Sequence, residues 1–423
     1  MNFYKYSVLV IICLLVIHSC KKHPDLPSVT TDTPAEITRT SVIVGGRVTD
    51  DRGLPLLDKG ICWDTKKNPD LSTHFIPADE GNENFFIKIT GLKPNTLYFV
   101  RAYATNELGT AYANEISFTT LTVTTGTVIT LQPSSISLNT ALARGKIIDD
   151  GDAAIIQKGV CWSTSSGPDI EHDPFTDNGT GTEDFTSNIT GLSPGTKYYV
   201  RAYTINSEGI SYGNEFFFNT KISDIQNNLY NTVTIGSQVW ITENLKVTRY
   251  TDNTLIPHVQ DNAEWVSLTT PGYCWFDNDI NKADWGALYN WYTVKTGKLC
   301  PTGWHVPTDT DFKTLELHLK MSSDQIDLWY WRGTDQGTQL KSSTGWQAGE
   351  NGTNSSGFSA LPYGYRFAAT GAFNGLNILT YWWSSEYNKD YALYRRVDGN
   401  ESELYRYYTS KRGGKYVRCI KTE

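Results

Sequence analysis

An internal repeat of about 100 residues is the feature that most constrains the fold of this chain. The segment KGICW at 59–63 recurs as KGVCW at 158–162, and ITGLKPNTLYFVRAY at 89–103 recurs as ITGLSPGTKYYVRAY at 189–203. A repeat of this length corresponds to one structural unit that is built more than once. Because 423 residues are also too many for a single core, we expect two repeated domains and a further domain after them.

Each repeat has the pattern of a β-sandwich. Residues 98–103 alternate between two faces with a period of two, as residues of a half-buried strand do. The motif L-x-P-x-T-x-Y, at 92–98 and again at 192–198, leads into this strand and resembles the tyrosine corner of fibronectin type III domains. We therefore predict two tandem fibronectin type III-like β-sandwiches, at residues 28–121 and 122–221.

Two features of the repeats suggest chemistry but have a simpler structural interpretation. Cys62 and Cys161 occur once per repeat, so neither sandwich can close a disulfide within itself, and we expect both to be small core residues. The segment GISYG at 209–213 fits the nucleophile-elbow pattern around Ser211, but that motif needs a strand–turn–helix context. Because the segment falls in the final strand pattern of a sandwich, we do not expect Ser211 to be catalytic.

The amino terminus has the pattern of an export signal. An unbroken apolar run at 8–17 is too short to span a bilayer, and Ser19 and Cys20 follow it. This order resembles a bacterial lipoprotein signal. The resemblance implies a signal peptide at 1–19, a lipidated Cys20 and a tether at 20–27; an ordinary secretory signal cut elsewhere is the alternative. We expect the protein to be anchored to the outer membrane, with the lipid as its only membrane contact. The sequence leaves open whether the protein faces the periplasm or the cell surface.

Charge and motifs argue against several functional classes. The formal net charge is −8, so the chain lacks the basic footprint that nucleic-acid binding requires. The sequence contains no P-loop, no dinucleotide-binding fingerprint, no HExxH motif and no CxxC motif. We therefore predict that the protein is not an enzyme and that it binds no nucleic acid.

After the second repeat the amino-acid composition changes. Eleven of the 13 tryptophans lie between 240 and 383. The segment LCPTGWHVPTDTDFKTLE at 299–316 looks reactive, but Thr308 and Asp311 form a capping-box pattern at the start of an amphipathic helix. His305 has no His, Cys or carboxylate at ligand spacing, so we interpret it as a hydrogen-bonded framework residue. This segment is therefore predicted to be a frame and not an active site.

The third part of the chain resembles one family in six separate blocks. These blocks stand in that family's order: VTIGSQVWITENLK, GALYNWYTV, LCPTGWHVPTDTDF, NSSGFSALPYGYR, YWWSSEY and KYVRCIK, between 233 and 421. They resemble the Fibrobacter succinogenes major paralogous domain, which we place at 226–423 and whose biochemical activity is unassigned. A more distant likeness, to C-type-lectin-like folds and the sulfatase-modifying-factor group, implies an α+β domain.

The lectin-like resemblance also implies a disulfide. It pairs Cys300, which lies just before the predicted helix, with Cys419 in the predicted last strand. Cys274 is the alternative partner for either cysteine. An oxidising compartment outside the cytoplasm would allow such a bond to form.

One loop of this domain collects oxygen ligands. Asp277, Asn278, Asp279, Asn281 and Asp284 lie within eight positions, and calcium takes about six to eight oxygens from such loops. The spacing resembles the start of an EF-hand loop, without its glycine or its final glutamate. A solvated loop of turn-forming residues explains the same composition and is the interpretation we favour. We predict no required cofactor; calcium is the metal that this loop would bind.

A second set of residues is predicted to contact a ligand. It consists of Trp382, Trp383, Glu386, Asn388 and Asp390, which stand where lectin-like folds often place a binding surface. Sugars stack on exposed tryptophan and tyrosine rings, so the aromatic triplets at 329–331 and 381–383 are candidates. Because strand residues alternate between faces, only part of each triplet can share one face.

These features together predict a mainly β multidomain envelope lipoprotein. Two sandwiches act as spacers and present a terminal α+β, C-type-lectin-like recognition domain. The predicted ligand is a glycan or a partner protein. The alternatives are a structural or assembly component of the cell envelope, or an enzyme with an unrecognised site.

Overall fold

The computed structural model describes residues 24–79, 81 and 83–422, so the predicted signal peptide at 1–19 and Cys20 lie outside the described residues. Strands make up 41% of the structure and helices 9%, which confirms a mainly β fold. The first sandwich forms one compact unit, and the second sandwich with the carboxy-terminal domain forms another. In the described part of the chain, no helix is long and apolar enough to cross a membrane.

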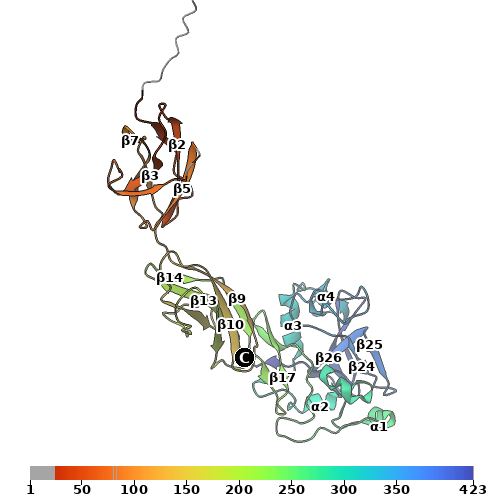
Figure 1. Ribbon diagram of the computed structural model, residues 1–423. Coiled ribbons are helices and arrows are strands. Elements are labelled where there is room, and N and C mark those ends of the chain that lie inside the picture. Colours follow the sequence, from red (N-terminus) through yellow and green to blue (C-terminus); the bar gives the residue numbers. More distant parts are fainter. Residues whose placement is uncertain (1–23, 80, 82, 423) are drawn as a thin grey trace, which may run out of the picture. The chain divides into compact units, whose positions relative to one another are not determined.

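The first sandwich packs two antiparallel sheets around one core (Figure 1). One sheet has the order β1-β2-β5: β1 (Ser28–Thr31), β2 (Ser41–Asp50) and β5 (Asn84–Thr90). The other has the order β4-β3-β6-β7, with β8 also paired to β6: β3 (Asp58–Asp64), β4 (His74–Pro77), β6 (Leu97–Asn106), β7 (Gly109–Tyr112) and β8 (Ile116–Thr119). Along β5 buried and exposed residues alternate, as a sheet with one solvated face requires.

The second sandwich repeats this arrangement. Its first sheet has the order β12-β10-β9: β9 (Thr127–Ser134), β10 (Ala141–Asp149) and β12 (Phe185–Ile189). In its second sheet the central strand is β13 (Lys197–Asn206). It pairs with β11 (Gln157–Ser163), β14 (Gly209–Tyr212) and β15 (Phe216–Asn219). Ser211 lies in the hairpin strand β14, which is not the strand–turn–helix setting of a nucleophile elbow.

Matching side chains make the same bonds in the two sandwiches. Tyr98 Oη accepts a hydrogen bond from the backbone N–H of Lys93 at 3.0 Å, and Tyr198 Oη accepts one from Ser193 at the same distance. These are the bonds of a tyrosine corner. Each repeat also buries one free thiol, at Cys62 and Cys161, and burial raises the pKa of both thiols, to about 11 for Cys62. Both cysteines are therefore unreactive core residues.

The carboxy-terminal domain is built on a six-stranded sheet with the order β23-β28-β27-β26-β24-β25; Figure 1 labels β24, β25 and β26 of this sheet. Its strands are β23 (Tyr330–Arg332), β24 (Tyr363–Arg366), β25 (Phe373–Leu376), β26 (Leu379–Tyr387), β27 (Tyr391–Asp398) and β28 (Leu404–Ser410). A smaller sheet has the order β18-β19-β29-β22: β18 (Thr232–Ile235), β19 (Gln238–Ile241), β22 (Trp304–His305) and β29 (Ile420–Lys421). The chain's last strand is therefore held between two earlier ones.

Short pairs and helices complete the domain. The two-stranded pairs are β16 (Ile222–Ser223) with β17 (Leu229–Tyr230), and β20 (Tyr273–Cys274) with β21 (Leu288–Tyr289). The helices are α1 (Asn262–Ser267), η1 (Phe276–Asn278), η2 (Ile280–Trp285), α2 (Trp291–Lys295), α3 (Asp309–His318) and α4 (Gln336–Leu340). Helix α3 starts with the predicted capping box: Thr308 Oγ1 accepts from Asp311 N, and the Asp311 carboxylate accepts from Thr308 N.

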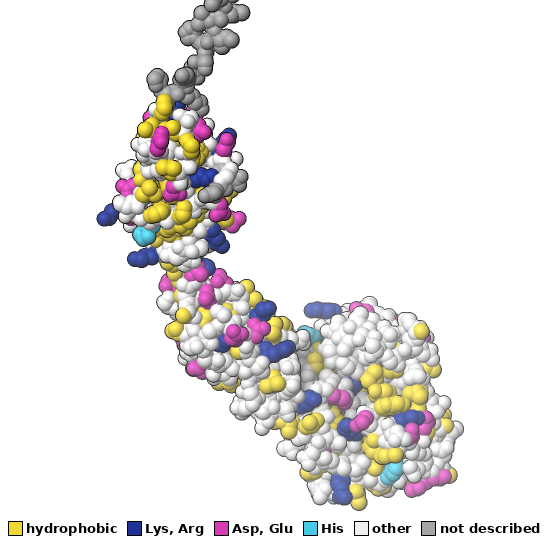
Figure 2. Space-filling view, in the orientation of Figure 1, with side chains coloured by type: hydrophobic (Ala, Val, Ile, Leu, Met, Phe, Trp, Pro, Cys, Tyr) yellow, Lys and Arg dark blue, Asp and Glu magenta, His cyan; other side chains and the backbone are white. Residues whose placement is uncertain are grey.

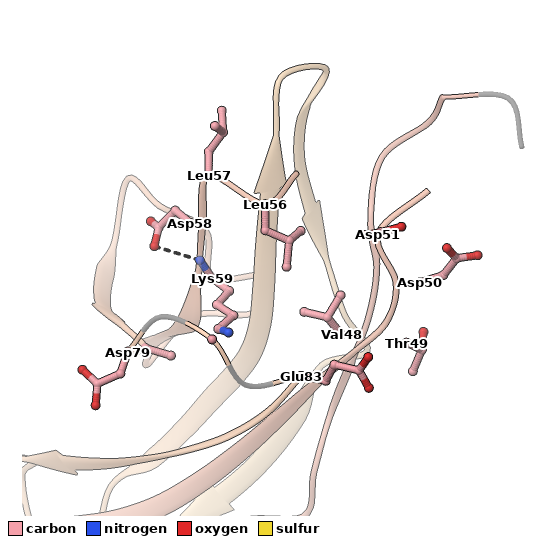
Figure 3. Close-up of a pocket in the computed structure, with 12 residues that line it drawn as sticks. Val48, Thr49, Asp50, Asp51, Leu56, Leu57, Asp58, Lys59, Asp79 and Glu83 are labelled. Atoms are coloured by element: carbon pink, nitrogen blue, oxygen red, sulfur yellow. Dashed lines mark hydrogen bonds between the residues drawn. The ribbon is translucent and has the colours of Figure 1, made fainter. Parts of the chain in front are cut away.

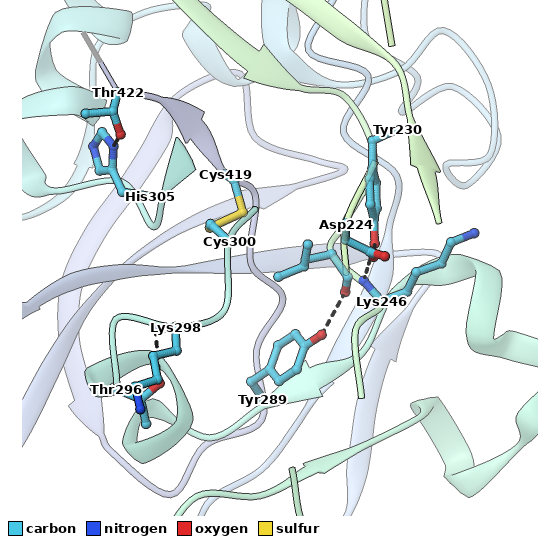
Figure 4. Close-up of a disulfide and its surroundings, with 11 residues drawn as sticks. Asp224, Tyr230, Lys246, Tyr289, Thr296, Lys298, Cys300, His305, Cys419 and Thr422 are labelled. Atoms are coloured by element: carbon cyan, nitrogen blue, oxygen red, sulfur yellow. Dashed lines mark hydrogen bonds between the residues drawn. A yellow bond between two sulfur atoms is a disulfide. The ribbon is translucent and has the colours of Figure 1, made fainter. Parts of the chain in front are cut away.

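A disulfide joins the segment that precedes α3 to the segment that enters the last strand. Cys300 and Cys419 are bonded across 119 positions of sequence, as the lectin-like resemblance implied (Figure 4). Cys274 is a free buried thiol. His305 is a framework residue, although it does have a carboxylate partner. Its Nε2 lies 3.0 Å from Asp311 Oδ2, and its Nδ1 lies 3.1 Å from Thr422 Oγ1. The segment that looks reactive in the sequence is thus used to hold the domain together.

Candidate ligand-binding site

The predicted metal loop does not gather its five residues around one point. Asp277 pairs with Lys282 at 2.6 Å, and Asp284 pairs with Lys246 at 2.9 Å. Asp279 Oδ1 instead accepts hydrogen bonds from the backbone and side-chain amides of Asn281, while the Asn278 amide donates to the Gln260 carbonyl. Among the residues that the structure describes, no three His, Cys, Asp or Glu side chains converge on a metal-sized space.

The prediction that Trp382 and Trp383 contact a ligand is wrong. Their exposed fractions are 1% and 0%, because β26 lies inside the sheet between β27 and β24 and is covered on both faces. Trp382 Nε1 donates to Asn244 Oδ1 at 2.9 Å, and Trp383 Nε1 donates to the carbonyl of Tyr289 at 2.8 Å. Both indoles are hydrogen-bonded core residues.

The three predicted contact residues in the loop after β26 differ in where the structure places them. Glu386 accepts a hydrogen bond from the backbone N–H of Asp309 at 3.1 Å, so its carboxylate caps α3. Asn388 lines a pocket, whereas Asp390 is exposed and is not part of the lining. Of the five predicted contact residues, only Asn388 lies in this pocket.

That pocket, called the aromatic pocket below, has a volume of about 660 Å³. Its lining is Trp329, Tyr330, Asn388, Tyr391, Tyr407 and Tyr408. Strand β23 pairs only with Leu404–Arg406, so the outer edge of β28 beyond Arg406 has no neighbouring strand in the described structure, and the pocket forms there. Small-molecule sites typically have volumes of about 300–1,000 Å³.

The rings of the aromatic pocket are unusually exposed for their size. The exposed fractions are 40% for Trp329, 52% for Tyr330, 52% for Tyr391 and 36% for Tyr407. Tyr330 stacks on Tyr407 with ring centroids 4.7 Å apart, and Trp329 lies 5.2 Å from Tyr408. Tyr330 also has a positive φ of 70°, a strained conformation for a bulky residue that is typical of functional positions. Figure 2 shows that hydrophobic side chains do gather in patches on the visible surface of this domain.

Polar atoms of the pocket lack partners in the described chain. The Asn388 Oδ1 atom accepts from the Tyr391 N–H at 3.1 Å, which leaves the amide nitrogen Nδ2 without a partner among the described residues. Trp329 Nε1 and the hydroxyls of Tyr391 and Tyr408 likewise make no hydrogen bond to the part of the chain that the structure describes. The lining contains no Asp, Glu, Lys, Arg or His. It therefore offers ring faces and neutral hydrogen-bonding groups to a ligand.

A larger pocket of about 860 Å³ lies in the first sandwich (Figure 3). Five carboxylates and Lys59 line it: Asp50, Asp51, Asp58, Asp79 and Glu83. In Figure 3 the labelled carboxylates do not converge on one point, and the Asp58 carboxylate is bonded to the Lys59 backbone N–H. In the second sandwich the equivalent Lys158 donates to the carbonyls of Gly181 and Glu183. We therefore take the aromatic pocket as the candidate site.

Three pocket residues were missed in the sequence. Tyr391, Tyr407 and Tyr408 come from two strands whose register cannot be read without the structure. The only local signal was the tyrosine-rich run at 405–408, in which neighbours alternate between faces. Trp329 and Tyr330 belong to a triplet that was a candidate for sugar stacking.

Comparison with known protein families gives a match for the carboxy-terminal domain. Residues 233–421 match the family model of the Fibrobacter succinogenes major domain, which is of an extracellular type. The comparison with curated proteins gave no match. Among solved structures, one match is the sensor domain of the anti-sigma factor RsgI4 from Pseudobacteroides cellulosolvens, at 21% identity and a TM-score of 0.19, covering 23% of this chain and 97% of that chain.

A second matching structure is a two-domain fibronectin type III segment of chicken tenascin. It shares 14% identity at a TM-score of 0.24 and covers 46% of this chain and 100% of that chain. Both scores are too low to carry an argument about function. The sandwich assignment rests on the strand pairing and the tyrosine corners described above.

Proposed function

We propose that this chain, whose carboxy-terminal domain is a Fibrobacter succinogenes major domain, is an envelope lipoprotein that binds neutral glycans through the aromatic pocket. Lipid on Cys20 would anchor it to the outer membrane, and the two sandwiches would act as spacers. The observation that carries the proposal is the exposed ring cluster with unpartnered neutral polar atoms around a space of about 660 Å³.

The chemistry of the lining supports a carbohydrate as the ligand. A pyranose has apolar C–H faces that pack on aromatic rings, and hydroxyls that bond to amide, indole and phenol groups. Trp329, Tyr391 and Tyr407 supply the faces, and Asn388 Nδ2 and the free hydroxyls supply the polar partners. A lining without ionised groups offers no charge to pair with an acidic sugar, so neutral glycans are favoured.

The same lining favours recognition over catalysis and over calcium-dependent binding. Tyrosine hydroxyls are the titratable groups of this lining, and it contains no carboxylate, histidine, lysine or cysteine that could exchange a proton with them or act as a nucleophile. It also contains no carboxylate that could hold a cation next to a bound sugar. A glycan is favoured over a partner protein because the ring cluster is a bounded pocket and not a broad flat patch.

Binding can be tested with residues 21–423 and a panel of oligosaccharides. The panel contains neutral gluco-, xylo-, manno- and galacto-configured hexasaccharides and an acidic galacturonate hexamer, measured by titration calorimetry with and without a chelator. At least one neutral member is expected to bind, with an affinity that the chelator leaves unchanged. No binding by any neutral member, or preference for the acidic one, would overturn the proposal.

Substitution of pocket residues identifies the site. Trp329→Ala is expected to cost about 2 kcal/mol of binding free energy or more, because central aromatic anchors carry that much in binding sites. Phe217→Ala removes an aromatic ring of 62% exposure from the second sandwich and serves as the matched control. Unchanged affinity in Trp329→Ala would show that any binding occurs elsewhere on the chain.

A further inference from the structure

Three consecutive large apolar residues of the aromatic pocket segment are held on the surface. Leu328, Trp329 and Tyr330 have exposed fractions of 51%, 40% and 52%, and Tyr330 is in a strained backbone conformation. Such a segment buries too little area to fix its own position. Something else in the fold must hold it if its rings are to present one defined surface.

Arg406 contacts this segment at both its backbone and its tryptophan ring. Its Nη1 donates to the carbonyl oxygens of Asp327 at 3.0 Å and Leu328 at 3.4 Å. Its guanidinium carbon lies 3.9 Å from the ring centroid of Trp329. The side chain of Arg406 is itself buried, on β28. One side chain therefore fixes both the backbone before Trp329 and the back face of its ring.

Arg406 is in turn anchored at the start of α3. Its Nε and Nη2 donate to the two carboxylate oxygens of Asp309 at 2.9 and 2.7 Å. Burial acts to raise the pKa of Asp309, but the hydrogen bonds and charges of Arg406 and Arg395 hold it below its usual value, so the carboxylate stays ionised. Lys313 adds a second link from Asp309 to Asp327, at 3.0 and 2.5 Å.

The opposite wall of the pocket is fixed at the same turn. The backbone N–H of Asp309 donates to Glu386, and the N–H of Ser385 donates to the carbonyl of Pro307 at 2.9 Å. These bonds hold the start of the loop that carries Asn388. The residues at 307–309 are thus the common support of both walls.

We infer that Arg406 is a positioning residue for recognition at the aromatic pocket, which it serves by locking Trp329 and the preceding backbone to Asp309. The inference rests on the proposed function for its consequence in binding. Its structural part, the locking of the segment at 327–330, can be measured without any ligand.

The first arm of the test measures hydrogen–deuterium exchange by mass spectrometry in residues 21–423. Arg406→Met is expected to raise exchange selectively in peptides that contain 327–330. Arg395→Lys is the matched control, because Arg395 also binds Asp309, at 2.7 Å, but lines no part of the pocket. If Arg406→Met does not fold, Arg406→Lys carries the same test, since lysine keeps an ion pair but loses the planar fork and the stacking.

The second arm measures affinity for the neutral hexasaccharide that binds most tightly in the panel. Arg406→Met is expected to weaken binding by about tenfold or more, which corresponds to about 1.4 kcal/mol. In a Trp329→Ala background the same substitution is expected to weaken binding by a smaller factor, because the ring that Arg406 positions is already absent. A merely structural role would weaken stability in both backgrounds without this loss of additivity in binding.

The outcomes separate the two proposals. Wild-type exchange at 327–330 and wild-type affinity in folded Arg406→Met would overturn the positioning role while leaving glycan binding intact. If no hexasaccharide binds the wild-type chain, the proposed function fails, and the exchange arm alone still decides whether Arg406 locks the segment.

Discussion

At the scale of single residues, the carboxy-terminal domain is notable for buried cations that have no carboxylate partner. Lys341 Nζ donates to the backbone carbonyls of Asp398, Gly399 and Glu401. Arg366 and Arg418 are likewise satisfied by carbonyl and amide oxygens and are stacked on aromatic rings. A cation held by carbonyls fixes two backbone segments at once, which suits a domain with short helices and many loops.

Lys415 is a buried lysine surrounded by aromatic rings, and its lowered pKa predicts a stability that depends on pH. Its Nζ lies 4.0 to 5.4 Å from the ring centroids of Tyr381, Tyr394, Trp383 and Tyr365. Burial, and to a smaller degree the charge of Arg396, lowers its pKa to about 7. Between that value and the unfolded pKa of about 10.4, the unfolded chain binds a proton that the folded chain does not, so stability rises with pH.

Lys415→Met is therefore expected to raise the free energy of unfolding at pH 7, by on the order of 1–4 kcal/mol, the range for replacing buried ionic groups with hydrophobic ones. It should also remove the rise in stability between about pH 7.5 and 9.5. Urea unfolding followed by tryptophan fluorescence reports on this domain, which holds 11 of the 13 tryptophans. The exposed Lys295→Met is the control; equal pH slopes for Lys415→Met and wild type would contradict the prediction.

At the scale of elements, α3 and its preceding segment form a frame around which the domain is assembled. The capping box sets where the helix starts, the disulfide joins its approach to β29, and Asp309 binds arginines on β27 and β28. Glu316, further along α3, is fully buried and binds Arg332 and Arg395. These links explain how so short a helix, of ten residues, holds a stable position against the sheet.

Removing the disulfide tests how much this frame depends on it. Cys300→Ala with Cys419→Ala is expected to lower the free energy of unfolding by about 2–5 kcal/mol, because the bond closes a loop of 119 residues and restricts the unfolded chain. Urea titration of the wild type and the double variant would measure the difference. Adding a reductant should destabilise the wild type and leave the double variant unchanged. Equal stability of the two proteins under oxidising conditions would contradict the role assigned to the bond.

The sequence predicts elements well where the signal is local. The capping box at Thr308 and the tyrosine corner at Tyr98 depend on residues within about six positions, so spacing alone identifies them. The aromatic pocket depends on which strands are neighbours. Trp382 was predicted to contact a ligand but is buried, because β26 is an inner strand covered on both faces. Trp329 precedes an edge strand and is exposed. Sequence pattern does not distinguish inner strands from edge strands when both are rich in aromatic residues.

At the scale of the whole molecule, the chain combines two similar bodies with one different one. The sandwiches repeat their core, their buried thiol and their corner tyrosine, and the aromatic pocket lies on the carboxy-terminal domain. This division suits a spacer that presents a recognition domain. A spacer of this kind requires that the amino-terminal end of the chain is attached to a surface.

The proposed attachment of the chain to the membrane depends on lipid at Cys20. When the full chain is expressed with its own leader in a bacterium that processes lipoproteins, it is expected to incorporate labelled palmitate and to sediment with membranes. Cys20→Ser should abolish both, because acyl chains on one cysteine would be the only membrane contact and contribute about 0.8 kcal/mol per buried methylene.

Cys13→Ser, which changes a cysteine within the apolar run of the leader, is the matched control and should leave labelling intact. Release of wild-type chain as a soluble, unlabelled protein would contradict lipid anchoring and favour an ordinary secretory signal. The carboxy-terminal domain would then act at a distance from the cell, and the sandwiches would need a role other than the proposed one of a spacer.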